Sequence, residues 1–148
     1  MARAETSEVL VLAADDSADD YVLIEQGFRN REQIRLVGRV EDGAAVIAYL
    51  KGEGLYADRQ KFPFPDLLLL DLKMPGVDGF EVLRWLQTQS FPELVVMVLS
   101  GSERREDMTL ALQLGAHYYQ TKQMDLAQQI KMSNLVEQYM VRQRRNPG

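Results

Sequence analysis

The chain has 148 residues and a mass of 16.9 kDa, which suits one compact domain, and 46% of its residues are hydrophobic, enough for a real core. Its formal net charge of −5 argues against nonspecific binding of the bulk surface to nucleic acid or to an anionic membrane. It contains no cysteine, which excludes disulfides, thiolate metal sites and a cysteine nucleophile.

The first part of the chain predicts two strands and two helices. The run VLVLAA at 9–14 is apolar throughout, as is typical of a strand covered on both faces. Ser17 is followed by acids, which is a helix start signal, and apolar residues then recur at helical spacing as far as Phe28. A weaker strand at 34–40 and a second helical pattern at 43–50 follow.

The rest of the chain continues the alternation after a long loop at 51–66, a length that is often functional or disordered. Helical spacing recurs between the later strands, and Ser102 with the acids after it predicts the start of one helix. The segment 124–145 predicts a long final helix with basic residues near its end. Three further strands are predicted at 67–70, 94–99 and 116–121.

This order of elements predicts the fold class. A strand followed by a helix, five times over, is typical of an α/β protein with a doubly wound parallel sheet, in the common strand order 2-1-3-4-5 with helices on both faces. Ligands of such sheets bind beyond the carboxyl ends of the strands. We therefore expect the functional residues at those ends.

Five polar residues follow the predicted strands at that edge. Because the first and third strands are neighbours in this order, three carboxylates converge there and repel one another unless a cation joins them. Hard oxygen ligands in small number favour magnesium. A metal, a lysine, a hydroxyl and a carboxylate nucleophile together suit phosphoryl transfer, with Asp71 as the best candidate nucleophile. The five residues are Asp15, Asp16, Asp71, Ser100 and Lys122.

Each of these residues also has a simpler explanation when taken alone. An acid at a strand end is usually a solvated loop residue or a helix cap, a lysine is usually solvated, and a serine is often a turn residue. The coincidence of five positions is what favours a site. His117, the only histidine, is interpreted as a local structural residue, and Trp85 as packing.

Four motifs in chain order closely resemble the receiver domain of two-component response regulators. They are LAADDS, LLLLDLKMPGVDG, VMVLSGS and GAHYYQTK, and the resemblance runs from about Val9 to Leu135. It implies a flavodoxin-like domain of five strands and five helices. It also implies a phosphoacceptor that supports its own phosphorylation and dephosphorylation and is not a conventional turnover enzyme.

The resemblance assigns the phosphoryl group to Asp71, which would take it from a phosphohistidine on a sensor histidine kinase or on a histidine phosphotransfer protein. It implies that Asp16, Asp71 and the backbone carbonyl of Lys73 bind Mg²⁺ directly, with Mn²⁺ as a substitute. Asp15 would act mainly through water.

The resemblance further implies that Lys122 pairs with the phosphoryl oxygens and that Ser100 moves to hydrogen-bond one of them. Tyr119 matches an aromatic residue that swings inward and alters the face formed by the fourth helix, fifth strand and fifth helix. The side chains at Lys73 and Ser102 fall at positions that tune dephosphorylation in the family.

The chain departs from the family pattern in two places near the site. Ser100 replaces the commoner threonine and should still donate a hydrogen bond. Gln123 replaces a proline that often follows the lysine in a cis peptide, and a non-proline cis bond costs about 2.5–4 kcal/mol. The sequence leaves open whether the Lys122–Gln123 bond is cis or trans.

The loop at 51–66 and the long final helix are similar to those of stand-alone regulators paired with phytochrome-type histidine kinases. We expect residues 1–148 to form a single receiver domain, with a core of about 9–135, no output domain and no direct binding of nucleic acid. Such a domain would act through a protein contact or pass the phosphoryl group onward in a relay. A homodimer through the fourth helix, fifth strand and fifth helix is a hypothesis based on the apolar stripe of the final helix, and packing of that stripe against the domain's own sheet is the alternative.

Location and membrane contact follow from the apolar segments. Charges interrupt the N-terminal residues before an apolar region of signal-peptide length can form. The longest apolar runs fall far short of the roughly 18 residues that span a bilayer. We expect a soluble, cytoplasmic protein with no membrane partner.

Three other classes of function stay open. A receiver-like binding module that works without phosphorylation would share the fold but needs a defective pocket. A hydrolase of the haloacid dehalogenase type also uses an aspartyl nucleophile and magnesium, but has an acid two residues later, where this chain has Lys73. A flavin binder shares the topology, but the acids of ADDSADD would repel the flavin phosphate.

Overall fold

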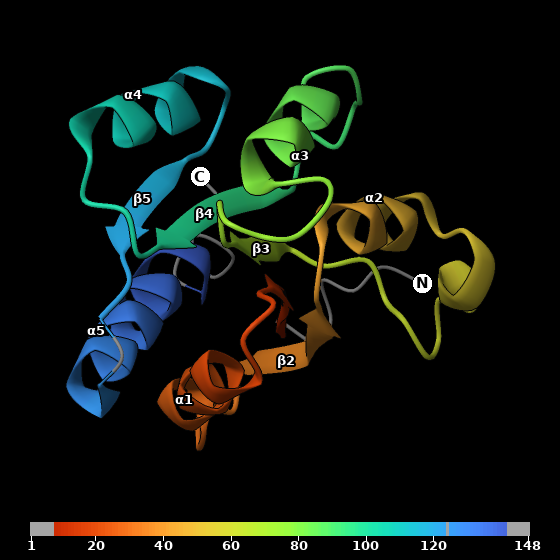
Figure 1. The fold of residues 1–148 in the computed structure, drawn as a ribbon. Coiled ribbons are helices and arrows are strands. Elements are labelled where there is room, and N and C mark those ends of the chain that lie inside the picture. The colour runs from red at the N-terminus through yellow and green to blue at the C-terminus, as the bar shows by residue number, and fades with distance from the viewer. Residues whose placement is uncertain (1–7, 124, 142–148) are drawn as a thin grey trace.

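The computed structural model describes residues 8–123 and 125–141, which form a five-stranded parallel sheet in the order β2-β1-β3-β4-β5 (Figure 1). This confirms the predicted fold class and strand order. The strands are β1 (Val9–Ala14), β2 (Ile34–Val40), β3 (Leu67–Leu70), β4 (Val95–Ser100) and β5 (Tyr118–Thr121). The helices are α1 (Ala18–Phe28), α2 (Gly43–Lys51), η2 (Gly54–Ala57), α3 (Gly79–Leu86), α4 (Arg105–Gln113), α5 (Leu126–Val136) and η3 (Glu137–Val141).

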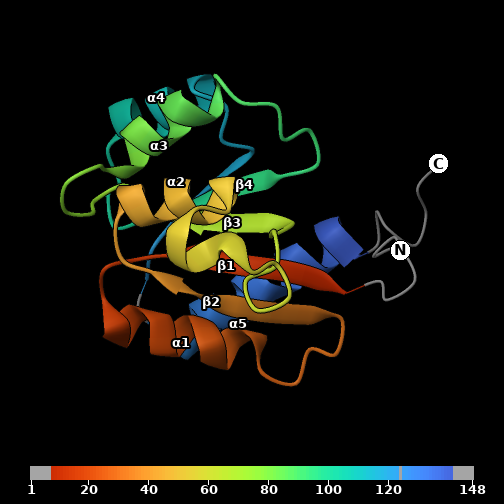
Figure 2. The ribbon, with the colours of Figure 1, turned by 90° about the vertical axis from the view of Figure 1, so that its right-hand side faces the viewer.

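Helices cover both faces of the sheet. Figure 2 shows α1 and α5 below the sheet, with α2, α3 and α4 above it. The two apolar clusters follow this division, because α1 and α5 contribute to one and α2, α3 and α4 to the other. No helix of the described residues is long and apolar enough to cross a membrane.

The four leucines of β3 show why the central strands do not alternate between apolar and polar residues. Leu68 and Leu70 belong to the cluster under α2, α3 and α4, whereas Leu67 and Leu69 belong to the cluster over α1 and α5. Successive side chains of a strand point to opposite faces, so a strand between two helical layers needs apolar residues at every position. All four leucines are buried, and the strand holds its last residue in one place.

The predicted start of α1 is confirmed, whereas that of α4 is wrong. The hydroxyl of Ser17 accepts a hydrogen bond from the backbone N–H of Asp20, as an N-cap does. At α4 the N-cap is Arg104, which makes no side-chain cap, and the helix begins at Arg105. The hydroxyl of Ser102 instead donates to Asp107 at 2.6 Å and accepts from the N–H of Arg104, so it organises the loop before the helix.

The loop at 51–66 is a packed structure and not an open excursion. It contains η2, and the guanidinium of Arg59 donates to the carbonyl oxygens of Tyr49 and Leu50 near the end of α2. The rings of Tyr49, Tyr56 and Phe62 meet with centroids 4.9–6.1 Å apart. Arginine at the last carbonyls of a helix satisfies acceptors that the helix itself leaves free.

The final helix differs from the prediction in its regularity. α5 runs from Leu126 to Val136 and continues as the π-helix η3. The two ends of the predicted helix, residue 124 and residues 142–145, lie outside the described residues. Its apolar stripe divides between two environments. Some of its members are buried against the sheet, namely Met132, Val136 and Met140, and others are exposed, namely Leu126, Ile130, Leu135 and Tyr139.

The start of α3 packs closely against the backbone that follows β3. A Cβ atom at Gly79 would lie 2.5 Å from the carbonyl oxygen of Asp71 and 2.7 Å from the Cα of Leu72. We expect Gly79→Ala to lower the free energy of unfolding by about 2 kcal/mol, because both neighbours are backbone and cannot move aside cheaply. Urea unfolding checks this. Gly101→Ala is the control, since a Cβ there has nothing within 4 Å, and an equal loss in both variants would contradict the explanation.

Candidate functional site

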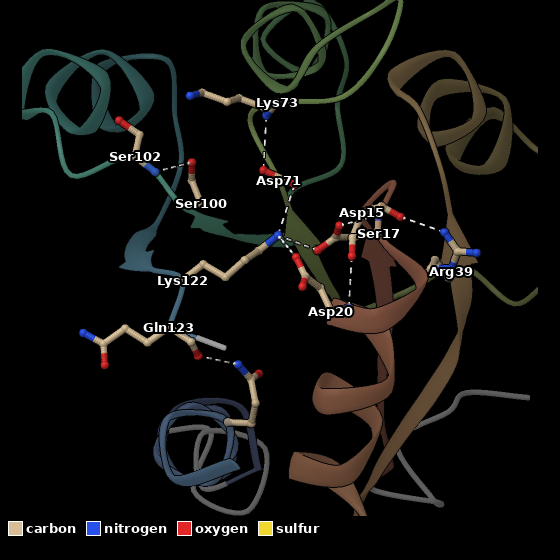
Figure 3. A network of polar contacts seen from close by, with 11 residues as sticks. Asp15, Ser17, Asp20, Arg39, Asp71, Lys73, Ser100, Ser102, Lys122 and Gln123 are labelled. Carbon is tan, nitrogen blue, oxygen red and sulfur yellow. Dashed lines mark hydrogen bonds and ion pairs between the residues drawn. The ribbon is translucent and has the colours of Figure 1, made fainter. Parts of the chain in front are cut away.

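The carboxyl ends of the strands bring the predicted residues together, as Figure 3 shows. The N–H of Asp71 donates to the carbonyl of Ala14 at 3.0 Å, which places the end of β3 beside the end of β1. The N–H of Lys122 donates to the carbonyl of Ser100 at 2.6 Å, which places the end of β5 beside that of β4. These two backbone hydrogen bonds extend the parallel ladders one residue beyond the strands and fix the backbone positions of Asp71 and Lys122.

Three carboxylates form a cluster at this edge. One ligand oxygen from each of Asp15, Asp16 and Asp71 lies within 4.8 Å of the other two. Asp15 and Asp71 are buried, while Asp16 is exposed, so the cluster opens to solvent on one side. Carboxylate oxygens are hard ligands, and three at this separation suit a Mg²⁺ or Mn²⁺ ion that keeps some of its water. The residues present therefore fit the metal that the sequence predicts.

The ammonium group of Lys122 lies among the carboxylates. Its Nζ donates to Asp15 at 2.7 Å, to Asp20 at 3.0 Å and to Asp71 at 3.2 Å. Burial alone would lower the pKa of Lys122, but the hydrogen bonds and negative charges of these acids outweigh it and raise the pKa. The lysine therefore stays charged and offsets part of the negative charge.

Asp71 has a different balance. The N–H of Lys73 donates to its Oδ1 at 3.2 Å, and Lys122 donates to its Oδ2. Burial raises the pKa of Asp71 above its ordinary value, although Lys122 and the N–H of Lys73 oppose the shift. The side chain of Lys73 extends away from the acid cluster (Figure 3).

The hydroxyl residues lie next to the cluster, on the side of β4. Ser100 is fully buried, and its Oγ accepts a hydrogen bond from the N–H of Ser102 at 3.2 Å. Among the described residues the hydroxyl of Ser100 has no direct hydrogen bond to the side chain of Asp71 or of Lys122. The hydroxyl of Tyr119 donates to the carbonyl oxygen of Ser102 at 2.9 Å, so the aromatic ring reaches over the loop between β4 and α4.

Two residues at the site were missed by the sequence interpretation. Asp20 is one of the acids after Ser17 that the sequence explains only as a helix start signal, yet its carboxylate accepts from Lys122. Its place three residues after the N-cap, in the turn directly after the first strand, was the available signal. Arg39 on β2 donates to the carbonyl oxygen of Asp15 at 3.0 Å, and no pattern in the sequence predicted this.

Two residues outside the site, and one peptide bond beside it, were also considered from the sequence. The Nδ1 of His117 accepts the N–H of Val96 at 3.0 Å, which confirms a local structural role for the histidine. Trp85 is half-buried against the core, as expected. The described residues contain no cis peptide bond, so the bond between Lys122 and Gln123 is trans.

The comparisons with known proteins agree with this geometry. The family model described as "Response regulator receiver domain" matches residues 11–134. In sequence the chain is 30% identical over 131 residues to response regulator Rcp1 from Synechocystis, an alignment that covers 88% of this chain and 87% of that protein.

Solved structures give the same result. The phosphorylated cyanobacterial phytochrome response regulator RcpA superposes with a TM-score of 0.79 at 30% identity, covering 90% of this chain and 94% of RcpA. The Mn²⁺-bound form of Rcp1 superposes with a TM-score of 0.75, also at 30% identity and with the same coverage of 90% and 94%. Fold, site geometry and comparisons together show that the chain belongs to the response regulator receiver family.

Proposed function

We propose that the chain is a phosphorylation switch of a two-component relay, in which Asp71 accepts a phosphoryl group from a phosphohistidine. The donor would be a sensor histidine kinase or a histidine phosphotransfer protein. The observation that carries the proposal is the position of Asp71. It directly follows the buried central strand β3, and its carboxylate oxygens lie within 4.8 Å of those of two other acids and 3.2 Å from an ammonium group.

The chemistry that this arrangement supports is an in-line displacement at phosphorus. A carboxylate oxygen of Asp71 forms the new bond to phosphorus while the bond to the histidine nitrogen breaks, and the imidazole leaves with that electron pair and takes up a proton. Phosphoryl transfer needs mainly positioning and charge compensation. Asp15, Asp16, Asp71 and the carbonyl of Lys73 would hold Mg²⁺, which when bound supplies positive charge against the phosphoryl oxygens.

The remaining site residues would stabilise and report the modified state. Lys122 is charged and already next to Asp71, so its ammonium would donate to a phosphoryl oxygen. Ser100 would turn toward the phosphoryl group and withdraw its Oγ from the N–H of Ser102. Because Tyr119 donates to the carbonyl of that same Ser102, its ring would respond and change the face formed by α4, β5 and α5.

The other functions receive less support from the site. A binding module without phosphorylation would not need a complete acid cluster beside a buried lysine. The dehalogenase-type hydrolase needs an acid where Lys73 stands, and a flavin phosphate would meet the negative charge of Asp15 and Asp16. The proposal therefore makes the protein a phosphoacceptor and not a turnover enzyme.

The similarity to Rcp1 and to the phytochrome response regulator RcpA suggests a light-sensing kinase as the input. We propose that a phytochrome-type histidine kinase is the phosphoryl donor. Phosphotransfer from each of the organism's histidine kinases, compared at short times, tests this. Preferential transfer from a kinase without a phytochrome-type sensor would contradict it.

Asp71→Asn tests the acceptor directly. Incubation with acetyl phosphate and Mg²⁺ should add one phosphoryl group to the native chain and none to the variant, because the amide is not a nucleophile for phosphorus. Intact-mass measurement reads the result. Asp42→Asn is the control, since Asp42 caps α2 and asparagine caps equally well. No adduct on the native chain, from acetyl phosphate or from a cognate kinase, would refute the proposal.

Asp16→Asn tests the metal site. Magnesium at 100 times its dissociation constant should raise the free energy of unfolding of the native chain by about 2.7 kcal/mol, and the variant should lose most of this gain. Without metal the variant should be at least as stable as the native chain, because it removes one of three like charges. Thermal unfolding with and without Mg²⁺ measures both. Asp19→Asn is the control, and an equal magnesium response in all three proteins would contradict the assignment.

The face of α4, β5 and α5 is the proposed output surface and dimer interface. Tyr118 and Tyr139 pack edge to face there with ring centroids 5.1 Å apart, and Leu135 is 48% exposed. We expect beryllofluoride with Mg²⁺, as a phosphoryl mimic, to shift the chain toward a dimer in sedimentation, and Leu135→Asp to prevent this. Val22→Asp, at an equally exposed apolar residue of α1, is the control. An unchanged monomer in both states would reject the dimer.

A further inference from the structure

Asp20 occupies a place that the phosphorylation chemistry proposed above does not use. Its backbone N–H is bound by the N-cap Ser17 at 3.1 Å, and its carboxylate accepts from the ammonium of Lys122 at 3.0 Å (Figure 3). Its side chain is only 22% exposed, whereas the adjacent acid Asp19 is exposed to solvent. Two acids of one helical turn therefore have different surroundings.

The ammonium of Lys122 has no donor to spare. It carries three N–H groups and no acceptor, and three carboxylates receive them: Asp15, Asp20 and Asp71. A phosphoryl group on Asp71 would add oxygens that need donors, so an existing contact must weaken when Lys122 turns to them.

Asp20 is the partner that can most easily be given up. Asp15 is the closer partner at 2.7 Å and its side chain is 3% exposed, so leaving it without the ammonium would strand a buried charge. Asp20 lies on the more open side, where water can replace the lysine. On phosphorylation, Lys122 should therefore release its hydrogen bond to Asp20 and donate to a phosphoryl oxygen instead.

We propose that Asp20 is a positioning residue that holds Lys122 in the unphosphorylated protein and competes with the phosphoryl group for its ammonium. The inference rests on the proposed function, in which Lys122 binds the phosphoryl oxygens. Asp20 thereby sets how strongly the site favours its unmodified state. The charge of Asp20 also favours the unphosphorylated state, because it adds a negative charge next to a site that must accept more negative charge.

Beryllofluoride affinity at saturating Mg²⁺ tests the competition. Asp20→Asn keeps the side-chain shape but replaces a charged acceptor of Lys122 with a weaker neutral one. It should therefore bind beryllofluoride roughly fivefold more tightly than the native chain, the size expected for one partly exposed ion pair. Asp20→Glu, which keeps the carboxylate, should return the affinity toward the native value. Unchanged or weaker binding by Asp20→Asn would overturn the proposal. If Asp20 merely supported the fold, its substitution could only weaken beryllofluoride binding.

Asp19→Asn is the matched control. It removes the same charge from the same turn of α1 but contacts no cation among the described residues, and it should leave the affinity within about twofold of the native value. An equal gain in both variants would assign the effect to net charge or to the helix dipole and overturn the role of the contact. Thermal unfolding of each variant verifies that it is folded.

A double-mutant cycle identifies Lys122 as the intermediary. In a Lys122→Gln background, measured over a wider range of beryllofluoride, Asp20→Asn should have no effect beyond that of Asp19→Asn. A full gain in that background would mean that Asp20 acts directly on the bound anion and would overturn the inference. A native chain that neither binds beryllofluoride nor gains a phosphoryl group would instead remove the proposed function, and the inference with it.

Discussion

The site depends on one buried ammonium group among carboxylates. Three acids within 4.8 Å of one another would repel strongly, and the charge of Lys122 offsets part of that repulsion from within hydrogen-bonding distance of Asp15 and Asp71. The lysine does not neutralise the cluster. The remaining negative charge makes this edge of the sheet attractive to a divalent cation. The positive charges of the cation and of Lys122 together are what phosphoryl transfer needs against the phosphoryl oxygens.

The layered fold is what makes this arrangement possible. Parallel strands buried on both faces hold their last residues with little freedom, and the register of β1 with β3 places Asp71 beside the end of β1. The same regularity holds the lysine, because the backbone of Lys122 is bonded to Ser100 of β4. Residues far apart in sequence therefore meet through backbone ladders, and the apolar sequence of the strands specifies those ladders.

Features that depend on one local pattern were predictable from the sequence, and features that depend on rotamers and loop packing were not. Apolar runs between helical patterns predicted alternating strands and helices, for which 2-1-3-4-5 is a common sheet order, and the five candidate residues were the acids, the hydroxyl and the lysine at the strand ends. Asp20 was missed because an acid in a first helical turn already has a sufficient local explanation. Arg39 was missed because its partner is a backbone carbonyl. The start at Ser102 was wrong because its hydroxyl bonds to Asp107 in preference to capping the helix.

The loop between β4 and α4 connects the site with the surface at β5. Helices α1 and α5 pack closely against each other, since a Cβ at Gly27 would lie 2.8 Å from the backbone oxygen of Gln129. The loop between β4 and α4 is more open at Gly101, where a Cβ would meet nothing within 4 Å. Ser100 and Tyr119 are both bonded to Ser102, which follows that open position. In the proposed switch, a rearrangement that begins at Asp71 would therefore pass through Ser100 and Ser102 in the loop between β4 and α4 and reach Tyr119 on β5.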